Sequence, residues 1–286
     1  MPKKSIDSGG SKEAEGIWGR AKRKMAALPI DSTPKALLVA GVIGLICGYL
    51  VTSSNVLLKP RYLANQEWDQ QKSLLDMVRS QPGMQELFEE VSAEHVKAHV
   101  IDLETGQHLQ AIDPNEFDQR AAAKLPDQSI EIAVDKDLAK IKRREKYAKV
   151  YLVSKDREIK MIILPVYGSG YASTLYGYLG LAADANTVVG LTFYEHAETP
   201  GLGARVGDAK WLQQWQGKQV RDSEGEIRIG VARGQVPASS PSAVYEVDGL
   251  SGATRTSRSV TGLLRYWLGD DGFGPYLSTL RPPEPE

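Results

Sequence analysis

The sequence predicts an α+β protein: a single N-terminal transmembrane helix, then a mixed, largely antiparallel-sheet domain with flanking helices. Residues 36–58 form an apolar run without a charge, and a helix needs roughly 20 such residues to cross a bilayer. Between residues 97 and 195, short segments alternate apolar and polar side chains around turns, which indicates hairpins. Amphipathic helices are predicted over 208–217 and 256–268. Strands grouped apart from helices favour α+β over a doubly wound sheet.

Charge and cysteine content exclude several classes of protein. The chain has 286 residues and a formal net charge of −1, which argues against nucleic-acid binding, because phosphate backbones recruit basic surfaces. Its one cysteine, Cys47, excludes a disulfide within this chain and a cysteine-ligated zinc or iron–sulfur site. His95 and His99 have helical i, i+4 spacing, but His99 enters a predicted strand, so no metal site is predicted. Redox chemistry would therefore need an organic cofactor.

The apolar run 36–58 is predicted to be an uncleaved membrane anchor. A signal peptide usually has an apolar core of about 7–15 residues, whereas this run is longer and follows 35 residues rich in charge. Lys and Arg are more frequent in residues 16–35 than in residues 59–78, which places the N-terminus in the cytoplasm. We therefore expect a single-pass membrane protein whose large C-terminal part lies across the membrane. In a Gram-negative bacterium this is the inner membrane, with the C-terminal part in the periplasm.

The anchor divides the chain into predicted parts. In chain order these are a basic cytoplasmic tail (1–35), the transmembrane helix (36–58), a helical linker (59–96), a periplasmic domain (97–281) and a C-terminal tail (282–286). The linker is predicted to break at Gln81-Pro82-Gly83, because proline and glycine interrupt helices.

The periplasmic domain begins with predicted strands. They cover residues 97–103, 130–134, 149–154, 159–166, 176–183, 187–195 and 227–233. The strands 149–154 and 159–166 are expected to form one hairpin. A second hairpin is expected to join 176–183 to 187–195 about Asp184-Ala185-Asn186.

Seven basic residues lie between residues 136 and 149. The favoured interpretation is the solvated face of a helix. The alternative is a contact with anionic lipid or with a partner subunit.

The segment 251–257, Ser-Gly-Ala-Thr-Arg-Thr-Ser, directly precedes the last predicted helix. Its small residues would let a ligand approach the backbone closely. Thr254, Thr256 or Ser257 would cap the helix, and the free N–H groups of a helix start suit a phosphate. An ordinary capping segment and a phosphate site both fit these residues.

A second candidate segment is Glu195–Gly203, in which Pro200-Gly201 forces a turn at the end of a predicted strand. The loop Tyr167–Tyr171 is rich in glycine and aromatic residues and would suit a flat ring. Glu198 would either hydrogen-bond a bound ligand or form a salt bridge. The sequence contains neither a Walker loop nor a Gly-x-Gly-x-x-Gly fingerprint after a strand, and nothing in it resembles a Ser/His/Asp triad.

The segment 248–257 resembles the flavinylation motif of the FMN-binding domain family, Asp-x-x-Ser/Thr-Gly-Ala-Thr/Ser-x-Thr. In that family the last Thr or Ser of the Ser-Gly-Ala-Thr core receives FMN from FAD as a phosphoester, through a separate flavin transferase. The resemblance implies that Thr254 carries covalent FMN.

Over about residues 35–275 the chain is similar to the family of C subunits of the sodium-translocating NADH:quinone oxidoreductase. The segments that carry this likeness are Leu58-Lys59-Pro60, Trp68–Leu75, Tyr176–Leu181, Asn186–Gly190 and Tyr194–Gly203. Two features depart from the family: the basic tail is long, and Gly170-Tyr171-Ala172 lacks the Leu-Trp pair often found there.

The resemblance implies an electron-transfer subunit of a six-subunit translocase. FMN would take an electron from an iron–sulfur centre and pass it to another flavin subunit, between NADH and quinone bound elsewhere, with coupling to sodium export. The implied contacts to the FMN phosphate end are Ser251, Gly252, Ala253 and Thr256. The implied contacts around the ring are Glu198, Thr199, Gly201, Leu202, Gly203, Leu175 and Tyr176.

Two other functions remain open from the sequence. One is the G subunit of an Rnf-type ferredoxin:NAD oxidoreductase, which shares both flavin segments but is typically shorter between membrane helix and domain. The other is a membrane-anchored periplasmic binding or scaffold module without redox chemistry, which would carry no flavin.

Overall fold

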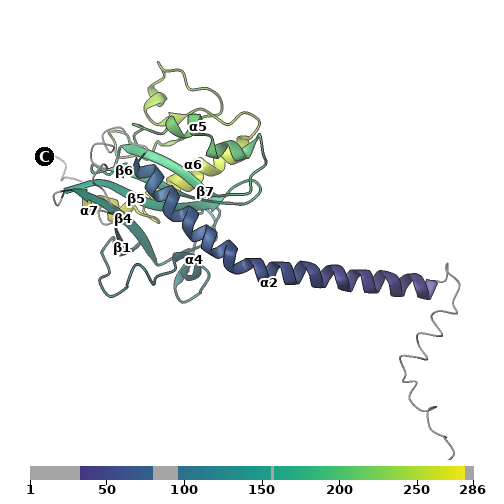
Figure 1. Ribbon diagram of the computed structural model, residues 1–286. Helices are drawn as coiled ribbons and strands as arrows, with labels where there is room; N and C mark the ends of the chain where they lie inside the picture. Colours follow the sequence, from purple (N-terminus) through teal and green to yellow (C-terminus); the bar gives the residue numbers. More distant parts are fainter. Residues whose placement is uncertain (1–32, 80–95, 156–157, 281–286) are drawn as a thin grey trace, which may run out of the picture. The chain divides into compact units, whose positions relative to one another are not determined.

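The computed structural model describes residues 33–79, 96–155 and 158–280, and Figure 1 shows their helices and strands. The first element is α2, Thr33–Arg79, a continuous helix of 47 residues. Its segment Lys35–Leu58 is the one helix in these ranges that is long and apolar enough to cross a membrane, and its most apolar window has no buried share. Exposed leucines such as Leu45 (77%) and Leu57 (75%) suit a lipid environment.

Helix α2 continues without a break into the predicted linker. Pro60 lies within it, although proline has no N–H to donate to the carbonyl of Val56. The helix ends at Arg79, just before the predicted break at Gln81-Pro82-Gly83. That break, the tail over 1–32 and the residues 281–286 lie outside the described residues.

Five antiparallel strands form the central sheet, in the order β1-β4-β5-β6-β7. They are β1 (Val96–Asp102), β4 (Tyr147–Lys155), β5 (Glu158–Ser169), β6 (Thr174–Ala182) and β7 (Val188–Glu195). Both predicted hairpins are confirmed, because β4 pairs with β5 and β6 pairs with β7. The α+β class is confirmed as well.

The turn between β6 and β7 is closed by Asp184. Its carboxylate accepts from the backbone N of Asn186 at 2.9 Å and of Thr187 at 2.8 Å. Ala185 has a φ of 54°, a left-handed conformation that costs energy without glycine. The two hydrogen bonds stabilise this turn.

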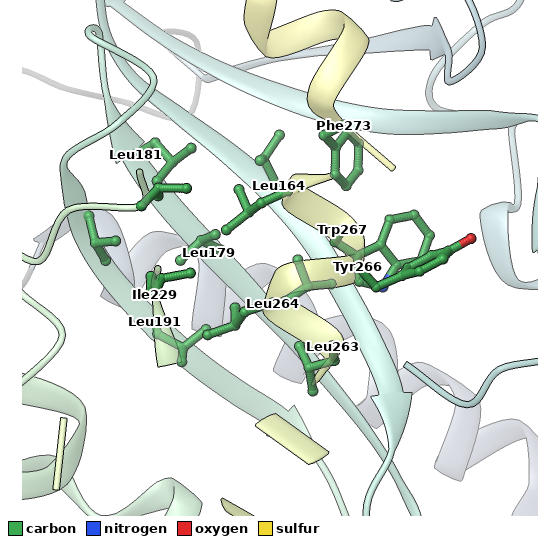
Figure 2. Close-up of a cluster of buried hydrophobic side chains, with 14 of the residues drawn as sticks. Leu164, Leu179, Leu181, Leu191, Ile229, Leu263, Leu264, Tyr266, Trp267 and Phe273 are labelled. Carbon is green, nitrogen blue, oxygen red and sulfur yellow. The ribbon is translucent and has the colours of Figure 1, made fainter. Parts of the chain in front are cut away.

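The hydrophobic core lies between the sheet and α6 (Thr254–Leu268). Figure 2 shows Leu264 and Trp267 of α6 together with Leu164 and Leu179 of the sheet, and all four side chains are fully buried. On α6 the buried residues recur every three or four positions, so one stripe of the helix faces the sheet.

The remaining elements are short. They are α4 (Gln119–Ala122), β2 (Ser129–Glu131), β3 (Arg143–Glu145), η2 (Gly203–Gly207), α5 (Ala209–Gln213), β8 (Gly230–Val231), η3 (Pro241–Val244), β9 (Glu246–Val247) and α7 (Gly274–Leu280). The predicted helix 208–217 corresponds to α5. The predicted strand 227–233 shrinks to β8, which pairs in parallel with β9.

The helix expected over residues 136–149 is wrong. Turns, strand β3 and the start of β4 occupy this range. Lys140 and Lys142 have φ values of 54° and 64°, which are not helical. The Asp137 carboxylate accepts from the backbone N of Ile141 at 2.9 Å and of Lys142 at 2.8 Å, so a carboxylate organises the turn that follows it.

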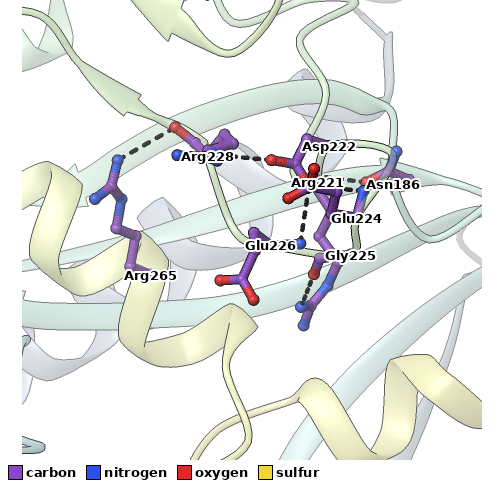
Figure 3. Close-up of polar contacts among 8 residues, drawn as sticks. All are labelled: Asn186, Arg221, Asp222, Glu224, Gly225, Glu226, Arg228 and Arg265. Atoms are coloured by element: carbon purple, nitrogen blue, oxygen red, sulfur yellow. Dashed lines mark hydrogen bonds and ion pairs between the residues drawn. The ribbon is translucent and has the colours of Figure 1, made fainter.

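Residues 221–228 form a loop beside the C-terminal half of α6 (Figure 3). Arg265 of α6 donates from Nε to the carbonyl of Ile229 at 3.0 Å and from Nη2 to that of Arg228 at 3.3 Å. Arg228 in turn donates from Nε to Asp222 at 2.6 Å. One guanidinium therefore ties the chain entering β8 to α6.

A buried carboxyl group, Glu145, lies at the end of β3 and has no exposed surface. It accepts hydrogen bonds from the Tyr167 hydroxyl at 2.6 Å and from the Gln119 amide at 2.5 Å. Burial raises the pKa of Glu145 above its usual 4.5, and these hydrogen bonds offset only part of that effect. Ionising Glu145 is therefore harder in the folded chain than in the unfolded chain.

We expect Glu145 to make stability depend on pH. Its pKa is raised on folding, so its contribution is complete below the unfolded pKa and is lost as pH rises through the folded pKa. Each unit between the two pKa values corresponds to about 1.4 kcal/mol. Glu145→Gln mimics the protonated form. As pH rises above 4.5, the urea concentration at its unfolding midpoint should therefore increase relative to that of the wild type. A constant difference between the two proteins across pH would contradict this expectation.

Candidate functional site

Thr254 is the first residue of α6, and its side chain is exposed. The preceding N-cap residue, Ala253, makes no side-chain capping bond. Within the part of the chain that the structure describes, the Thr254 hydroxyl has no hydrogen-bond partner. An exposed hydroxyl at the start of a 15-residue helix is well placed to carry a phosphate, because free N–H groups and the helix dipole favour negative charge there.

The two neighbouring hydroxyls in the first turn are buried and occupied. Thr256 is 1% exposed and Ser257 is 5% exposed. Thr256 Oγ1 donates to Glu198 Oε2 at 2.6 Å, and Ser257 Oγ accepts from the backbone N of Leu250 at 3.1 Å. Within 251–257, the exposed hydroxyls are therefore those of Thr254 and Ser251.

Glu198 connects three segments of the site. The residue is 4% exposed. Besides the bond from Thr256, its carboxylate accepts from the backbone N of Ala172 at 2.8 Å and of Ser173 at 3.3 Å. The loop 170–173, the loop 198–203 and the start of α6 thus meet on one carboxylate. The salt bridge considered from the sequence does not form among the described residues.

Two glycines pack directly on the Glu198 carboxylate. A Cβ at Gly170 would lie 2.5 Å from Glu198 Oε1, and a Cβ at Gly203 would lie 2.5 Å from Oε2 and 2.7 Å from Thr256 Oγ1. These distances are far below van der Waals contact, so the close approach of these segments requires glycine at both positions.

The turn Thr199–Leu202 presents an apolar side chain beside the motif. The backbone N of Leu202 donates to the carbonyl of Thr199 at 3.1 Å, and Gly201 has a φ of 75°. Leu202 is 44% exposed. A Cβ at Gly252, whose φ is 74°, would lie 2.9 Å from Leu202 Cδ2, so this leucine lies directly against the backbone two residues before Thr254.

Tyr171 provides a second exposed apolar group near the helix start. Its side chain is 59% exposed, and the guanidinium carbon of Arg255 lies 5.3 Å from its ring centre. Arg255 directly follows Thr254. The sequence predicted an aromatic loop over 167–171, which is wrong in part, because residues 167–169 are the end of β5 and pair with β6. The loop begins at Gly170, and it brings Tyr171 to the start of α6.

Leu175 and Tyr176 do not join this cluster through any described contact. Leu175 has no exposed surface and belongs to the core. Tyr176 stacks on Tyr167 with ring centres 5.6 Å apart, and the Arg120 guanidinium carbon lies 3.7 Å from its ring centre. Burial raises the pKa of Tyr176. These two residues lie at the start of β6, just after the loop 170–173.

Sequence reasoning missed residues that fix the motif from a distance. Gln214 and Trp211, at α5, both hydrogen-bond Asp248. The signal available in the sequence was Asp248 itself, the first residue of the motif. Its partners lie more than 30 positions away, and short-range patterns do not report such contacts.

The described residues contain no group of three or more His, Cys, Asp or Glu that could hold a metal ion. His99 and His108 form an edge-to-face pair with ring centres 4.9 Å apart. His95 lies outside the described residues, so its spacing to His99 stays a sequence observation.

Comparison with known proteins identifies the relatives of this chain. The FMN-binding domain family matches residues 170–269, which include the whole cluster around Thr254. The C subunit of the Na(+)-translocating NADH-quinone reductase of Pseudomonas aeruginosa is 44% identical over 88% of this chain and 97% of that protein. The C subunit of the same reductase from Yersinia pestis is 38% identical over 88% of this chain and 94% of its own length.

A solved structure agrees with these relatives. The crystal structure of Shewanella oneidensis NqrC matches with a TM-score of 0.66 and 34% identity, covering 76% of this chain and 98% of that chain. These relatives match this chain over almost their whole length, well beyond the FMN-binding domain of residues 170–269. The chain therefore belongs to the family of C subunits of the Na(+)-translocating NADH-quinone reductase.

Proposed function

We propose that this chain is the electron-carrying C subunit of a sodium-translocating NADH:quinone reductase and holds FMN as a phosphoester on Thr254. The main support for this proposal is that the hydroxyls in the first turn of α6 differ in exposure and in hydrogen bonding. Thr254 is exposed and unpaired within the described residues, whereas Thr256 and Ser257 are buried and bonded. Family membership supports the wider function, because the relatives are named as reductase subunits.

Attachment would be a phosphoryl transfer from FAD, catalysed by a separate flavin transferase. The Thr254 oxygen forms a bond to the phosphorus of the FMN half of FAD. The bond from that phosphorus to the bridging oxygen breaks, AMP leaves, and the hydroxyl proton is lost to a base of the transferase or to solvent. No redox change occurs in this step.

The residues around Thr254 fit a covalently held flavin. FMN supplies one- and two-electron redox chemistry that the side chains of this protein lack. Ser251, Gly252, Ala253 and the free N–H groups of α6 would face the phosphate end. Leu202 and Tyr171 offer exposed apolar surface, which a flat ring would cover. Thr199, Gly201 and Gly203 shape the loop that carries Leu202.

Glu198, Thr256 and Leu175 would act beneath this surface. Glu198 bonds both to Thr256 and to loop 170–173, so this carboxylate would hold these segments together. Leu175 would pack under the loop from the core, and Tyr176 would border it. Permanent attachment keeps the carrier at the site irrespective of its free concentration, in the manner of a tethered ligand.

The partners and location follow from the same proposal. NADH and quinone would bind other subunits of a six-subunit complex, and electrons would reach FMN from an iron–sulfur centre and leave to another flavin. Residues 36–58 would cross the inner membrane, the tail 1–35 would be cytoplasmic, and residues 97–281 would be the periplasmic domain behind the linker 59–96. The exposed apolar segment Lys35–Leu58 supports this arrangement.

Peptide mapping tests the attachment in the native complex. Trypsin cleaves after Arg233 and Arg255, and the resulting peptide 234–255 contains both Ser251 and Thr254. We expect mass spectrometry to find FMN on this peptide, with fragmentation placing it on Thr254. FMN on Ser251, or an unmodified peptide from cells that express the flavin transferase, would contradict the proposal. Co-purification of the other reductase subunits, rather than Rnf subunits, separates the two redox functions.

A further inference from the structure

Asp248, the first residue of the modification motif, is held through all of its polar atoms. Its backbone N donates to Gln214 Oε1 at 2.9 Å, and its Oδ2 accepts from Gln214 Nε2 at 3.3 Å. Its Oδ1 accepts from the backbone N of Val236 at 2.7 Å, and its carbonyl accepts from Trp211 Nε1 at 2.8 Å. These four hydrogen bonds fix the position of Asp248 in the folded chain.

The residues between Asp248 and Thr254 are fixed as well. The backbone N of Gly249 donates to the carbonyl of Gly234 at 2.8 Å, and the backbone N of Ala253 donates to the carbonyl of Leu250 at 3.0 Å. Leu250 is 4% exposed and Ala253 is 7% exposed. A Cβ at Gly249 would lie 2.5 Å from the carbonyl oxygen of Ala232. The segment therefore alternates anchored residues with the exposed Ser251, Gly252 and Thr254.

We propose that the flavin transferase modifies this segment in its folded form, and that Gln214 and Trp211 are positioning residues for the modification. They lie outside the motif and act through Asp248. The inference rests on the proposed attachment of FMN to Thr254. Its physical basis is pre-organisation: a hydroxyl already held in place spares the enzyme the entropy of ordering a flexible loop.

The opposing view is that the transferase reads the motif as an extended peptide. Asp248 would then contact the enzyme directly, and Gln214 and Trp211 would not matter for modification. An exchange of side chains distinguishes the two hypotheses. The carboxylate of Asp248 and the amide of Gln214 can swap positions, which keeps a hydrogen-bonded contact between the two residues but removes the carboxylate from the motif.

The exchange uses Asp248→Asn, Gln214→Glu and their combination. In Gln214→Glu, a carboxylate replaces the amide donor 3.3 Å from Asp248 Oδ2, so two carboxylates repel each other. In Asp248→Asn, the new side-chain oxygen takes the bond from the backbone N of Val236, so the new NH2 group faces the Gln214 NH2 group and two donors meet. In the double variant, the amide introduced at position 248 can donate to the carboxylate introduced at position 214, which also accepts from the backbone N of residue 248. The contact is restored with donor and acceptor reversed.

The measurement is the rate of covalent flavin attachment to the full-length chain in detergent, with purified transferase and FAD. We expect each single variant to be labelled more slowly, by roughly 10²-fold if the hydroxyl is displaced by about 1 Å. The double variant should recover most of the lost rate. Labelling of Gln214→Glu at the wild-type rate, or a double variant as slow as Asp248→Asn, would overturn the proposal.

A matched pair of tryptophans guards against general damage to the fold. Trp211 and Trp215 are ring neighbours, 5.5 Å apart and both buried. Trp211 Nε1 donates to Asp248, whereas Trp215 Nε1 has no hydrogen-bond partner among the described residues. Trp211→Phe should slow labelling and Trp215→Phe should not. Equal rates for the two variants would count against the proposal, and a wild-type chain that is never labelled would contradict the attachment itself.

Discussion

Thr254→Ala should abolish covalent FMN while leaving the protein folded. The side chain is exposed and has no hydrogen-bond partner in the part of the chain that the structure describes, so its removal should change the free energy of unfolding by no more than about 0.5 kcal/mol. The phosphoester, in contrast, cannot form without the hydroxyl. On a denaturing gel under ultraviolet light, the wild-type band should fluoresce and the variant band should be dark at equal protein load.

Two control variants show that the effect belongs to this hydroxyl. Thr254→Ser keeps a hydroxyl at the same position, and the family motif accepts serine there, so its band should fluoresce. Ser251→Ala removes the other exposed hydroxyl of the segment and should leave FMN attached, although more slowly if Ser251 contacts the phosphate. A fluorescent Thr254→Ala band that disappears only when Ser251 is also replaced would move the attachment to Ser251.

The sequence predicted the sheet because its signals are local. The alternating apolar and polar residues on both sides of Asp184 predicted the hairpin of β6 and β7. The apolar stripe of α6 predicted the helix that covers the sheet. The prediction of a helix over 136–149 was wrong because it rested on the density of charged residues. Its backbone is set by the Asp137 turn and by pairing of β3 with β2, contacts that composition does not encode.

The candidate site was predictable in part. The motif located Thr254 at the start of α6, and the turn at Gly201 was expected from Pro200-Gly201. The role of Glu198 was not predictable, since its partners Ala172 and Thr256 lie 26 and 58 positions away. Such long-range hydrogen bonds decide which hydroxyls are free. The expectation of a flavin came from the family resemblance, and the structure adds that the Thr256 hydroxyl is buried and bonded to Glu198.

Trp267→Ala should be among the most destabilising substitutions in the domain. Trp267 has no exposed surface and contacts Tyr167, Tyr266 and Phe273, with ring centres 4.9–5.4 Å away. Its Nε1 also donates to the carbonyl of Tyr167 at 2.6 Å, which ties α6 to β5. Truncation would leave a cavity between helix and sheet, at a cost of about 3–5 kcal/mol. Urea unfolding followed by circular dichroism measures this loss.

Two further variants separate volume from hydrogen bonding at this position. Trp267→Phe keeps most of the apolar contact and loses the bond to Tyr167, so its cost should be smaller, with about 1 kcal/mol from the bond. Leu202→Ala removes a side chain that is 44% exposed, and it should stay within about 0.5 kcal/mol of wild type. Equal losses for the Phe and Ala variants would show that the bond, rather than packing, holds α6 on the sheet. Because α6 begins at Thr254, a helix loosened at Trp267 should also present the hydroxyl less well, and slower flavin attachment should accompany the lost stability.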